Sequence, residues 1–279
     1  MMSKAEKTIP FYKMSGSGND FIIIDNRQPK FDEADLSRLI VGACRRKMSA
    51  GADGLILVED AQGVDFKWRF YNSDGSRADM CGNGARCASR FAFLEGIANE
   101  TLCFETDAGI ISATVNGKKV NIKMTDPKDL GEEASLDVNG TTIAYRSINT
   151  GVPHAIIEAE DLEGVDVVAV GRAVRNHPAF APNGTNANFI HIEDDGTLGI
   201  RTYERGVEDE TLACGTGNVA AALISSLRHG LPSPVKLLTR SGEYLSIYFD
   251  RRGDVFSDVY LEGDARVIYT GELSPEAWQ

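Results

Sequence analysis

The sequence lacks the features that mark membrane proteins, disulfide scaffolds and nucleic-acid binders. The longest apolar run covers only residues 219–224, whereas a membrane span needs about 18 apolar residues. Five cysteines in 279 residues are too few for a disulfide framework, and their odd number is typical of a reducing compartment. Lys and Arg number 29 against 41 Asp and Glu, and the resulting net charge of −12 argues against nucleic acid as a partner. Residues 1–14 contain lysines but no apolar segment, so we expect no secretory signal and a cytoplasmic location without membrane contact.

Signals for a bound metal or dinucleotide are also missing. The four histidines are scattered and no Cys-x-x-Cys occurs, so we predict no zinc site. Gly215, Gly217 and Ala220 formally match the spacing of a dinucleotide-binding loop. However, residues 210–214 make a poor buried strand, and no acidic residue follows at the required distance. We therefore predict that this loop has another purpose.

Local patterns predict an α+β fold of two domains with largely antiparallel strands. The fractions of 42% hydrophobic and 25% charged residues are typical of a globular protein, and the length suits two domains. Strands are predicted at residues 21–25, 55–59, 66–71 and 101–105. Helices are predicted at residues 36–46, 85–95 and 218–227, with tight turns at 115–118, 240–243 and 251–254. The polar segment 127–139 is the best candidate for a linker.

One pattern occurs twice. Residues 69–72 (Arg-Phe-Tyr-Asn) lead to Cys-Gly-Asn-Gly at 81–84, and residues 201–204 (Arg-Thr-Tyr-Glu) lead to Cys-Gly-Thr-Gly at 214–217. The offset is 132 residues for the arginines and 133 for the cysteines. A strand, a turn, Cys-Gly-x-Gly and a helix follow in the same order each time, which indicates a duplicated unit.

Each Cys-Gly-x-Gly lies where a strand gives way to a helix. The first amides of a helix are unpartnered donors with a partial positive charge, so they stabilise a thiolate or a bound carboxylate, and we expect the pKa of each cysteine to fall. A thiolate on one face of an α-carbon and a thiol on the other are the base and acid that inversion of an amino acid requires. Cys44, Cys87 and Cys103 are interpreted as small buried apolar residues.

Four segments, in this order, closely resemble the diaminopimelate epimerases: residues 18–21 (Gly-Asn-Asp-Phe), 81–87 (Cys-Gly-Asn-Gly-Ala-Arg-Cys), 203–206 (Tyr-Glu-Arg-Gly) and 213–217 (Ala-Cys-Gly-Thr-Gly). The resemblance covers essentially the whole chain. It implies a cofactor-independent isomerase that interconverts LL- and meso-diaminopimelate in lysine and peptidoglycan precursor biosynthesis. It also implies two pseudo-symmetric domains, each of strands wrapped around a central helix, with the active site in the cleft between them. The expected halves are residues 1–126 with 264–279 returning to them, and residues 127–263. The segment Val267-Ile268-Tyr269 resembles one that supports a homodimer.

The resemblance also implies the site residues. Cys81 and Cys214 match the two catalytic thiols, and His154 and Glu204 match residues that tune the pKa values of those thiols. The expected substrate-binding residues are Asn19, Gly54, Asn72, Gly82, Asn83, Asn186, Glu204, Arg205, Gly215 and Thr216. Val152 stands where many members have asparagine, and Gly54 where some have glutamine, so a broader amino-acid racemase remains an alternative. A non-catalytic amino-acid binder is a second alternative, and a plain core histidine is the alternative for His154.

Overall fold

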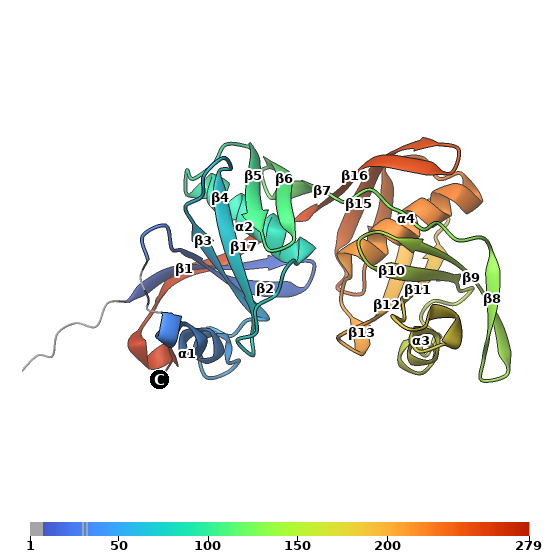
Figure 1. Cartoon of the computed structure of the whole chain (residues 1–279), viewed down its shortest axis with the longest axis horizontal. Coiled ribbons are helices and arrows are strands. Elements are labelled where there is room, and N and C mark those ends of the chain that lie inside the picture. Colours follow the sequence, from blue (N-terminus) through green and yellow to red (C-terminus); the bar gives the residue numbers. More distant parts are fainter. Residues whose placement is uncertain (1–7, 30, 32, 279) are drawn as a thin grey trace, which may run out of the picture. The chain divides into compact units, whose positions relative to one another are not determined.

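The computed structural model describes residues 8–29, 31 and 33–278, which form two compact units. The first unit contains the described residues up to Ile122 together with those from Asp264 onward, and the second contains Lys123–Gly263 (Figure 1). The expected lack of a secretory signal concerns mainly residues 1–7, which lie outside the described residues. None of the helices in the described ranges is long and apolar enough to cross a membrane.

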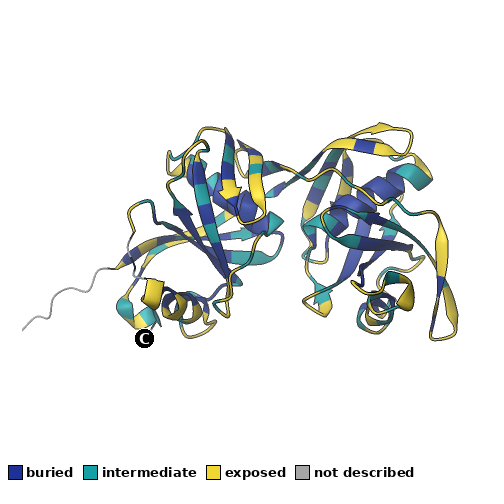
Figure 2. Ribbon diagram, viewed as in Figure 1, coloured by how far each residue is buried: buried dark blue, intermediate teal, exposed yellow. Residues whose placement is uncertain are grey.

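The first unit consists of strands that surround one helix. Its strands are β1 (Ile9–Gly16), β2 (Asn19–Asp25), β3 (Gly54–Glu59), β4 (Phe66–Asn72), β5 (Thr101–Thr106), β6 (Gly109–Asn116), β7 (Lys119–Lys123) and β17 (Arg266–Leu273). Its helices are α1 (Glu33–Cys44), α2 (Gly82–Leu94) and the short η2 (Pro275–Trp278). Helix α2 is largely buried among the strands, whereas α1 exposes one side to solvent (Figure 2). The core therefore forms on both faces of β2 and β3.

The sequences of β2 and β3 suit strands that are covered on both faces. Each contains four consecutive buried apolar residues, which is typical of parallel strands between two helical layers. Ile22, Leu55 and Leu57 pack against α1, whereas the side chain of Ile56 reaches Gly84 in α2. Strand β2 pairs in parallel with β3, and β4 with β5.

The second unit repeats this arrangement. Its strands are β8 (Ala134–Val138), β9 (Thr141–Asn149), β10 (Pro153–Glu158), β11 (Asn186–Ile192), β12 (Leu198–Glu204), β13 (Asp209–Thr211), β14 (Val235–Leu238), β15 (Tyr244–Arg252) and β16 (Val255–Asp264). Its helices are α3 (Val167–Arg175), the short η1 (Pro178–Phe180) and the central α4 (Gly215–His229). Ten residues of α4 are buried, so α4 forms the centre of this unit as α2 does in the first.

The two units share their topology. In each, an outer helix connects two parallel strands, β2 to β3 through α1 and β10 to β11 through α3. An antiparallel strand follows (β4 or β12), then the central helix, then a strand parallel to the one before it (β5 or β14). The predictions of an α+β fold and of a duplicated unit are confirmed.

Several local expectations need correction. The predicted linker at 127–139 is wrong in its second half, because β8 forms there and buries Leu136 and Val138 against β9 and α3. Helix α3 was not predicted. The three predicted turns do join antiparallel neighbours. Among the described residues, however, the pairs β2–β3, β4–β5, β10–β11 and β12–β14 are parallel because helices connect them.

Candidate active site

The two Cys-Gly-x-Gly segments form the same local structure. Cys81 is the N-cap of α2 with φ −147° and ψ 116°, and Cys214 is the N-cap of α4 with φ −109° and ψ 111°. Neither N-cap side chain forms a capping hydrogen bond, and the first amides of a helix have no partner within the helix. Cys81 is half-buried and Cys214 is buried.

In the first unit the expected site residues meet at one end of the strands. Asn19 begins β2, Gly54 begins β3 and pairs with Asn72 at the end of β4, and α2 begins beside them. The Nδ2 of Asn83 donates to the Oδ1 of Asn19 at 2.7 Å. A methyl group on Gly54 would lie 2.6 Å from both the Cε2 of Phe70 and the carbonyl oxygen of Tyr71, so this position leaves no room for a side chain.

The amide of Asn19 is held by charged neighbours that the sequence did not reveal. Its Nδ2 donates to the Oδ2 of Asp53 at 3.0 Å, and the Nη2 of Arg46 contacts the Oδ1 of Asp53 at 2.8 Å. Burial alone would raise the pKa of Asp20, but hydrogen bonds from Arg46 and Lys13 outweigh it and lower that pKa. These groups fix the loop that carries Asn19.

In the second unit the expected residues also meet at one strand end. His154 lies in β10 and pairs with Asn186, which begins β11, while Glu204 ends β12. The Nδ2 of Asn186 donates to the carbonyl of Pro153 at 2.9 Å, and its Oδ1 accepts from the backbone N–H of Arg205 at 2.8 Å. Asn186 thus connects β10 to the turn after β12.

The surroundings of Cys214 favour its thiol form. Burial raises its pKa to about 12, and the negative charge of Glu204 adds to this effect. The hydroxyl of Thr216, 3.6 Å from the sulfur, and the amide of Gly217 act in the opposite direction. The expectation that the helix start lowers the pKa of Cys214 is therefore wrong, because burial and a carboxylate outweigh the helix dipole. Burial also raises the pKa of Glu204, whose Oε2 accepts from the hydroxyl of Thr211 at 2.9 Å.

His154 is fully buried and uncharged. Burial is the main cause that lowers its pKa to about 3, and the charge of Arg205 lowers it further. Its Nε2 lies 3.0 Å from the Oγ1 of Thr216, and its Nδ1 lies 3.1 Å from the Nδ2 of Asn188. His154 thus reaches Cys214 through the hydroxyl of Thr216.

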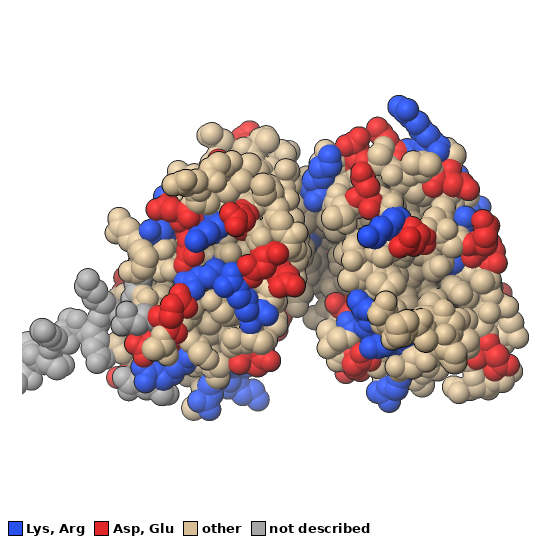
Figure 3. All heavy atoms as spheres, viewed as in Figure 1, with Lys and Arg blue, Asp and Glu red and all other residues tan. Residues whose placement is uncertain are grey.

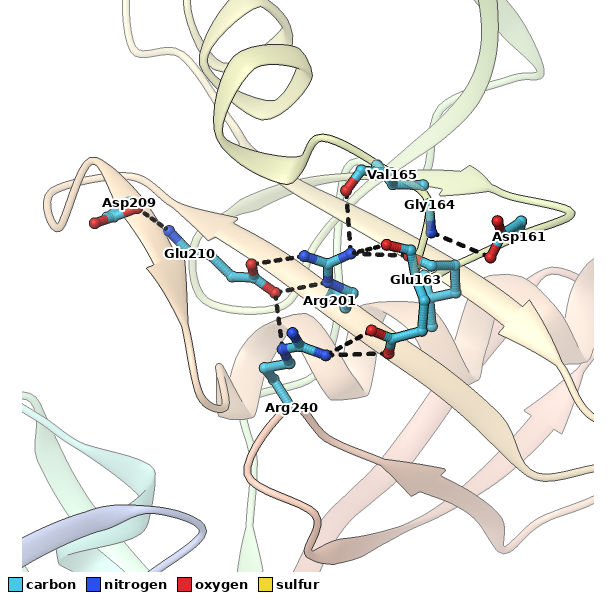
Figure 4. A network of polar contacts seen from close by, with 9 residues as sticks. Asp161, Glu163, Gly164, Val165, Arg201, Asp209, Glu210 and Arg240 are labelled. Carbon is cyan, nitrogen blue, oxygen red and sulfur yellow. Dashed lines mark hydrogen bonds and ion pairs between the residues drawn. The ribbon is translucent and has the colours of Figure 1, made fainter.

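An ion-pair network holds the hairpin that presents Glu204 and Arg205 (Figure 4). The Nε and Nη2 of Arg201 in β12 donate to the carboxylate of Glu210 in β13 at 2.7 and 2.8 Å. Its Nη1 donates to the carbonyls of three residues before α3, namely Leu162, Glu163 and Val165. Arg69, its counterpart in β4, pairs with Glu59 and with Glu33 at the start of α1. In both units the repeated arginine attaches the strand before the cysteine to the start of the outer helix.

Two residues of the site were missed because they carry no motif. Asn188 and Thr202 are buried polar residues that pair across β11 and β12. The available signal was the alternation of asparagines at 186 and 188 in an otherwise apolar strand.

The charged side chains do not indicate a metal or a strongly basic surface. Within residues 8–29, 31 and 33–278, no cluster of three or more His, Cys, Asp or Glu is arranged to hold a metal ion. Acidic and basic side chains lie interspersed over the visible face of both units (Figure 3).

Comparison with known proteins identifies the family. The family model for diaminopimelate epimerase matches residues 11–130 and 146–268. The chain belongs to the diaminopimelate epimerase family. The diaminopimelate epimerase of Aquifex aeolicus is 47% identical over 278 residues, covering 95% of this chain and 98% of that protein. That of Archaeoglobus fulgidus is 43% identical, covering 95% and 96%.

Solved structures share the fold of this family member at much lower identity. A PhzF-family phenazine biosynthesis protein of Bacillus anthracis superposes with a TM-score of 0.73 at 16% identity, covering 96% of this chain and 99% of that one. A probable proline racemase from Agrobacterium radiobacter K84 gives 0.68 at 15% identity, with 96% and 95% covered. These likenesses support the duplicated α+β fold.

Proposed function

We propose that this protein is a diaminopimelate epimerase that interconverts the LL and meso forms of its substrate without a cofactor. The observation that carries the proposal is the placement of Cys81 and Cys214 at the same N-cap position of two duplicated central helices, in a chain of this family. One thiolate and one thiol are the minimum that a two-face proton transfer at an α-carbon requires.

The roles of the two thiols follow from their surroundings. The pKa of Cys214 is raised to about 12, so this thiol holds its proton at rest. We infer that Cys81 is then the thiolate that removes the α-proton while Cys214 gives its proton to the opposite face. The C–H and S–H bonds that break are replaced by an S–H bond at Cys81 and a C–H bond at the α-carbon. For the other isomer, the two cysteines exchange roles.

The charge that develops during this step falls on the substrate carboxylate. The amides at the start of α2 and α4 suit it, so the proposed carboxylate ligands are Gly82, Asn83, Gly215 and Thr216. We propose that the remaining groups of the substrate are held by Arg205, Asn19, Gly54, Asn72 and Asn186. In the transition state, the contact between these amides and the carboxylate makes the main electrostatic contribution to catalysis.

Proton NMR of LL-diaminopimelate with the reduced protein in D2O, without added cofactor, tests this proposal. We expect loss of the α-proton signal and growth of the meso isomer, and we expect Cys81→Ala and Cys214→Ala to abolish both. Cys103→Ser is the matched control, since it removes a thiol outside the site. Exchange of other amino acids at equal rates would instead indicate the broader racemase, and binding without exchange would indicate the binder.

We further propose a cytoplasmic homodimer. Ile268 and Tyr269 on β17 are 54% and 43% exposed, and they are apolar side chains that a second copy of the chain would cover. Light scattering of the wild type and of Ile268→Asp measures the assembly directly. A monomeric wild type contradicts the dimer without affecting the proposed reaction.

A further inference from the structure

One face of the strands in the second unit carries buried polar residues at the end near Cys214. On β10, β11 and β12 these residues, mostly buried, are His154, Asn186, Asn188, Thr202 and Glu204, whereas the same face is apolar farther along the strands, at Ile156, Ile190 and Ile200. The opposite face carries apolar residues that pack against α3. A buried polar group costs free energy unless it finds a hydrogen-bond partner, so this group of residues needs a connected network where apolar residues would need none.

The duplication shows that the fold itself does not need these polar groups. Strand register gives the equivalent positions, because Ile56 pairs with Phe70 in the first unit as Asn188 pairs with Thr202 in the second. In the first unit, the equivalents of His154, Asn188 and Thr202 are Phe21, Ile56 and Phe70, in that order.

The central helices confirm this equivalence independently. A methyl group on Gly84 would meet Ile56, and a methyl group on the equivalent Gly217 would meet Asn188. Phe21 and Phe70 contact each other edge-on with ring centroids 5.9 Å apart, as part of an ordinary apolar core. The same fold therefore packs with apolar residues behind Cys81 and with polar residues behind Cys214.

Hydrogen bonds fix the orientation of the Asn188 amide. Its Nδ2 lies 3.2 Å from the carbonyl of Ala155 and 3.4 Å from that of Asn186, and both are acceptors, so this atom must be the donor. Its Oδ1 accepts from the hydroxyl of Thr202 at 3.0 Å. The amide cannot turn over without placing two oxygens against each other.

This orientation determines the protonation of His154. The Nδ1 of His154 faces a donor and must accept, so in the neutral ring the proton lies on Nε2. Nε2–H then donates to the Oγ1 of Thr216, and the hydroxyl proton of Thr216 is free to point at the sulfur of Cys214. Hydrogen bonds are thus donated in one direction, from Thr202 through Asn188, His154 and Thr216 to Cys214. We call this chain of residues the relay.

We propose that Asn188 and Thr202 are positioning residues that hold His154 in its Nε2–H tautomer, so that Thr216 supplies a hydrogen bond to Cys214 whenever its sulfur becomes a thiolate. Glu204 supplies the acceptor when the sulfur is a thiol. Cys214 therefore has a partner in both states. The catalytic part of this inference rests on the proposed function, whereas the tautomer itself does not.

Nitrogen-15 NMR of histidine-labelled protein tests the tautomer, with the His154 signals assigned by their loss in His154→Gln. We expect the proton on Nε2 in the wild type and on Nδ1 in Asn188→Asp, because the carboxylate accepts there. A wild-type ring protonated on Nδ1 overturns the proposal. Failure of the proposed function is distinguishable, since it leaves this spectrum unchanged.

Kinetics with diaminopimelate test the consequence. In Asn188→Asp we expect kcat to fall by about 10- to 100-fold, as for outer-shell partners of other sites, with KM changed by less than about threefold. A reversed tautomer with unchanged kcat contradicts the relay.

A second pair of variants tests the relay if Asn188→Asp does not fold. We expect Thr202→Val to lower kcat and Thr202→Ser, which keeps the hydroxyl, to restore it. Thr197→Val, which removes another buried hydroxyl beside β12, is the control. Equal kcat in Thr202→Val and Thr202→Ser also contradicts the relay.

Discussion

At the residue scale, Cys214 shows how burial and charge compete with a helix dipole. Its N-cap position favours a thiolate, but the buried site and the carboxylate of Glu204 keep the proton on sulfur and raise its pKa to about 12. The opposing donors, Thr216 and Gly217, limit this effect without reversing it. The chemistry of this thiol is therefore set by its neighbours and not by the motif alone.

Changing Glu204→Gln is expected to lower the pKa of Cys214, because it removes a negative charge while burial remains. Each pKa unit lost makes alkylation by iodoacetamide at pH 8 about threefold faster, because the thiolate fraction rises while each thiolate becomes less nucleophilic, and mass spectrometry of the Cys214 peptide measures this rate. We expect epimerase turnover to fall at least about tenfold, because the carboxylate that accepts from the Cys214 thiol is lost. Glu160→Gln, an exposed carboxylate of the same unit, is the control. An unchanged alkylation rate in Glu204→Gln contradicts the assignment.

His154 is expected to make the folded state sensitive to acid. Its pKa falls from the ordinary 6.5 to about 3 on folding because it is buried. Between these values the unfolded chain binds the extra proton, so stability is lost as the pH falls below about 6.5. The loss has a slope of at most about 1.4 kcal/mol per pH unit. Urea unfolding at pH 7, 6 and 5 should show a shallower pH dependence in His154→Gln than in the wild type or in His177→Gln. Parallel curves contradict the buried neutral ring.

At the element scale, the starts of α2 and α4 look alike in sequence but differ in packing. A methyl group on Gly84 would lie 3.3 Å from the flexible end of Ile56, whereas one on Gly217 would lie 2.5 Å from the Oδ1 of Asn188. Gly217 therefore allows the side chain of Asn188 to approach α4 closely.

Replacing each glycine with alanine should separate these cases. Alanine favours a helix by about 1 kcal/mol over glycine, so we expect Gly84→Ala to stay within about 1 kcal/mol of the wild type. Gly217→Ala should lose about 1–3 kcal/mol through overpacking and should also lose turnover. Urea unfolding, with hydrogen exchange of α2 and α4, measures both variants. If both variants lose the same free energy of unfolding, the contact with Asn188 does not explain the loss in Gly217→Ala.

Local sequence signals predict some of these elements, whereas contacts between distant segments determine others. The glycine turns and helical periodicity that begin α2 and α4 are local signals, so those helices and the duplication were found. Strand β8 lies in a polar segment and is stabilised by β9 and α3, which no local pattern shows. Asn188 and Thr202 are 14 residues apart and meet only through strand register. Residues without a motif become visible only once the fold brings them together.

At the scale of the whole molecule, the proposed reaction requires one cysteine from each unit. Each unit supplies one cysteine at the start of its central helix, and the chain passes between the units at residues 122–123 and again at 263–264. A proton that leaves one face of a carbon and arrives on the other requires both sulfurs to reach the same atom. The proposed reaction therefore predicts that the two thiols come close to one another during turnover.

Mild oxidation is expected to capture this approach. Two cysteines form a disulfide when their Cα atoms come within about 4.4–6.8 Å, so diamide should join Cys81 to Cys214, with the two thiol hydrogens passing to the reagent. Peptide mapping should find this bond, activity should fall with its formation, and dithiothreitol should restore both. Cys103→Ser should behave as the wild type, because that thiol takes no part. If diamide instead leaves the two cysteines unlinked while each still reacts with iodoacetamide, they do not act on one carbon, and the two-thiol mechanism is wrong.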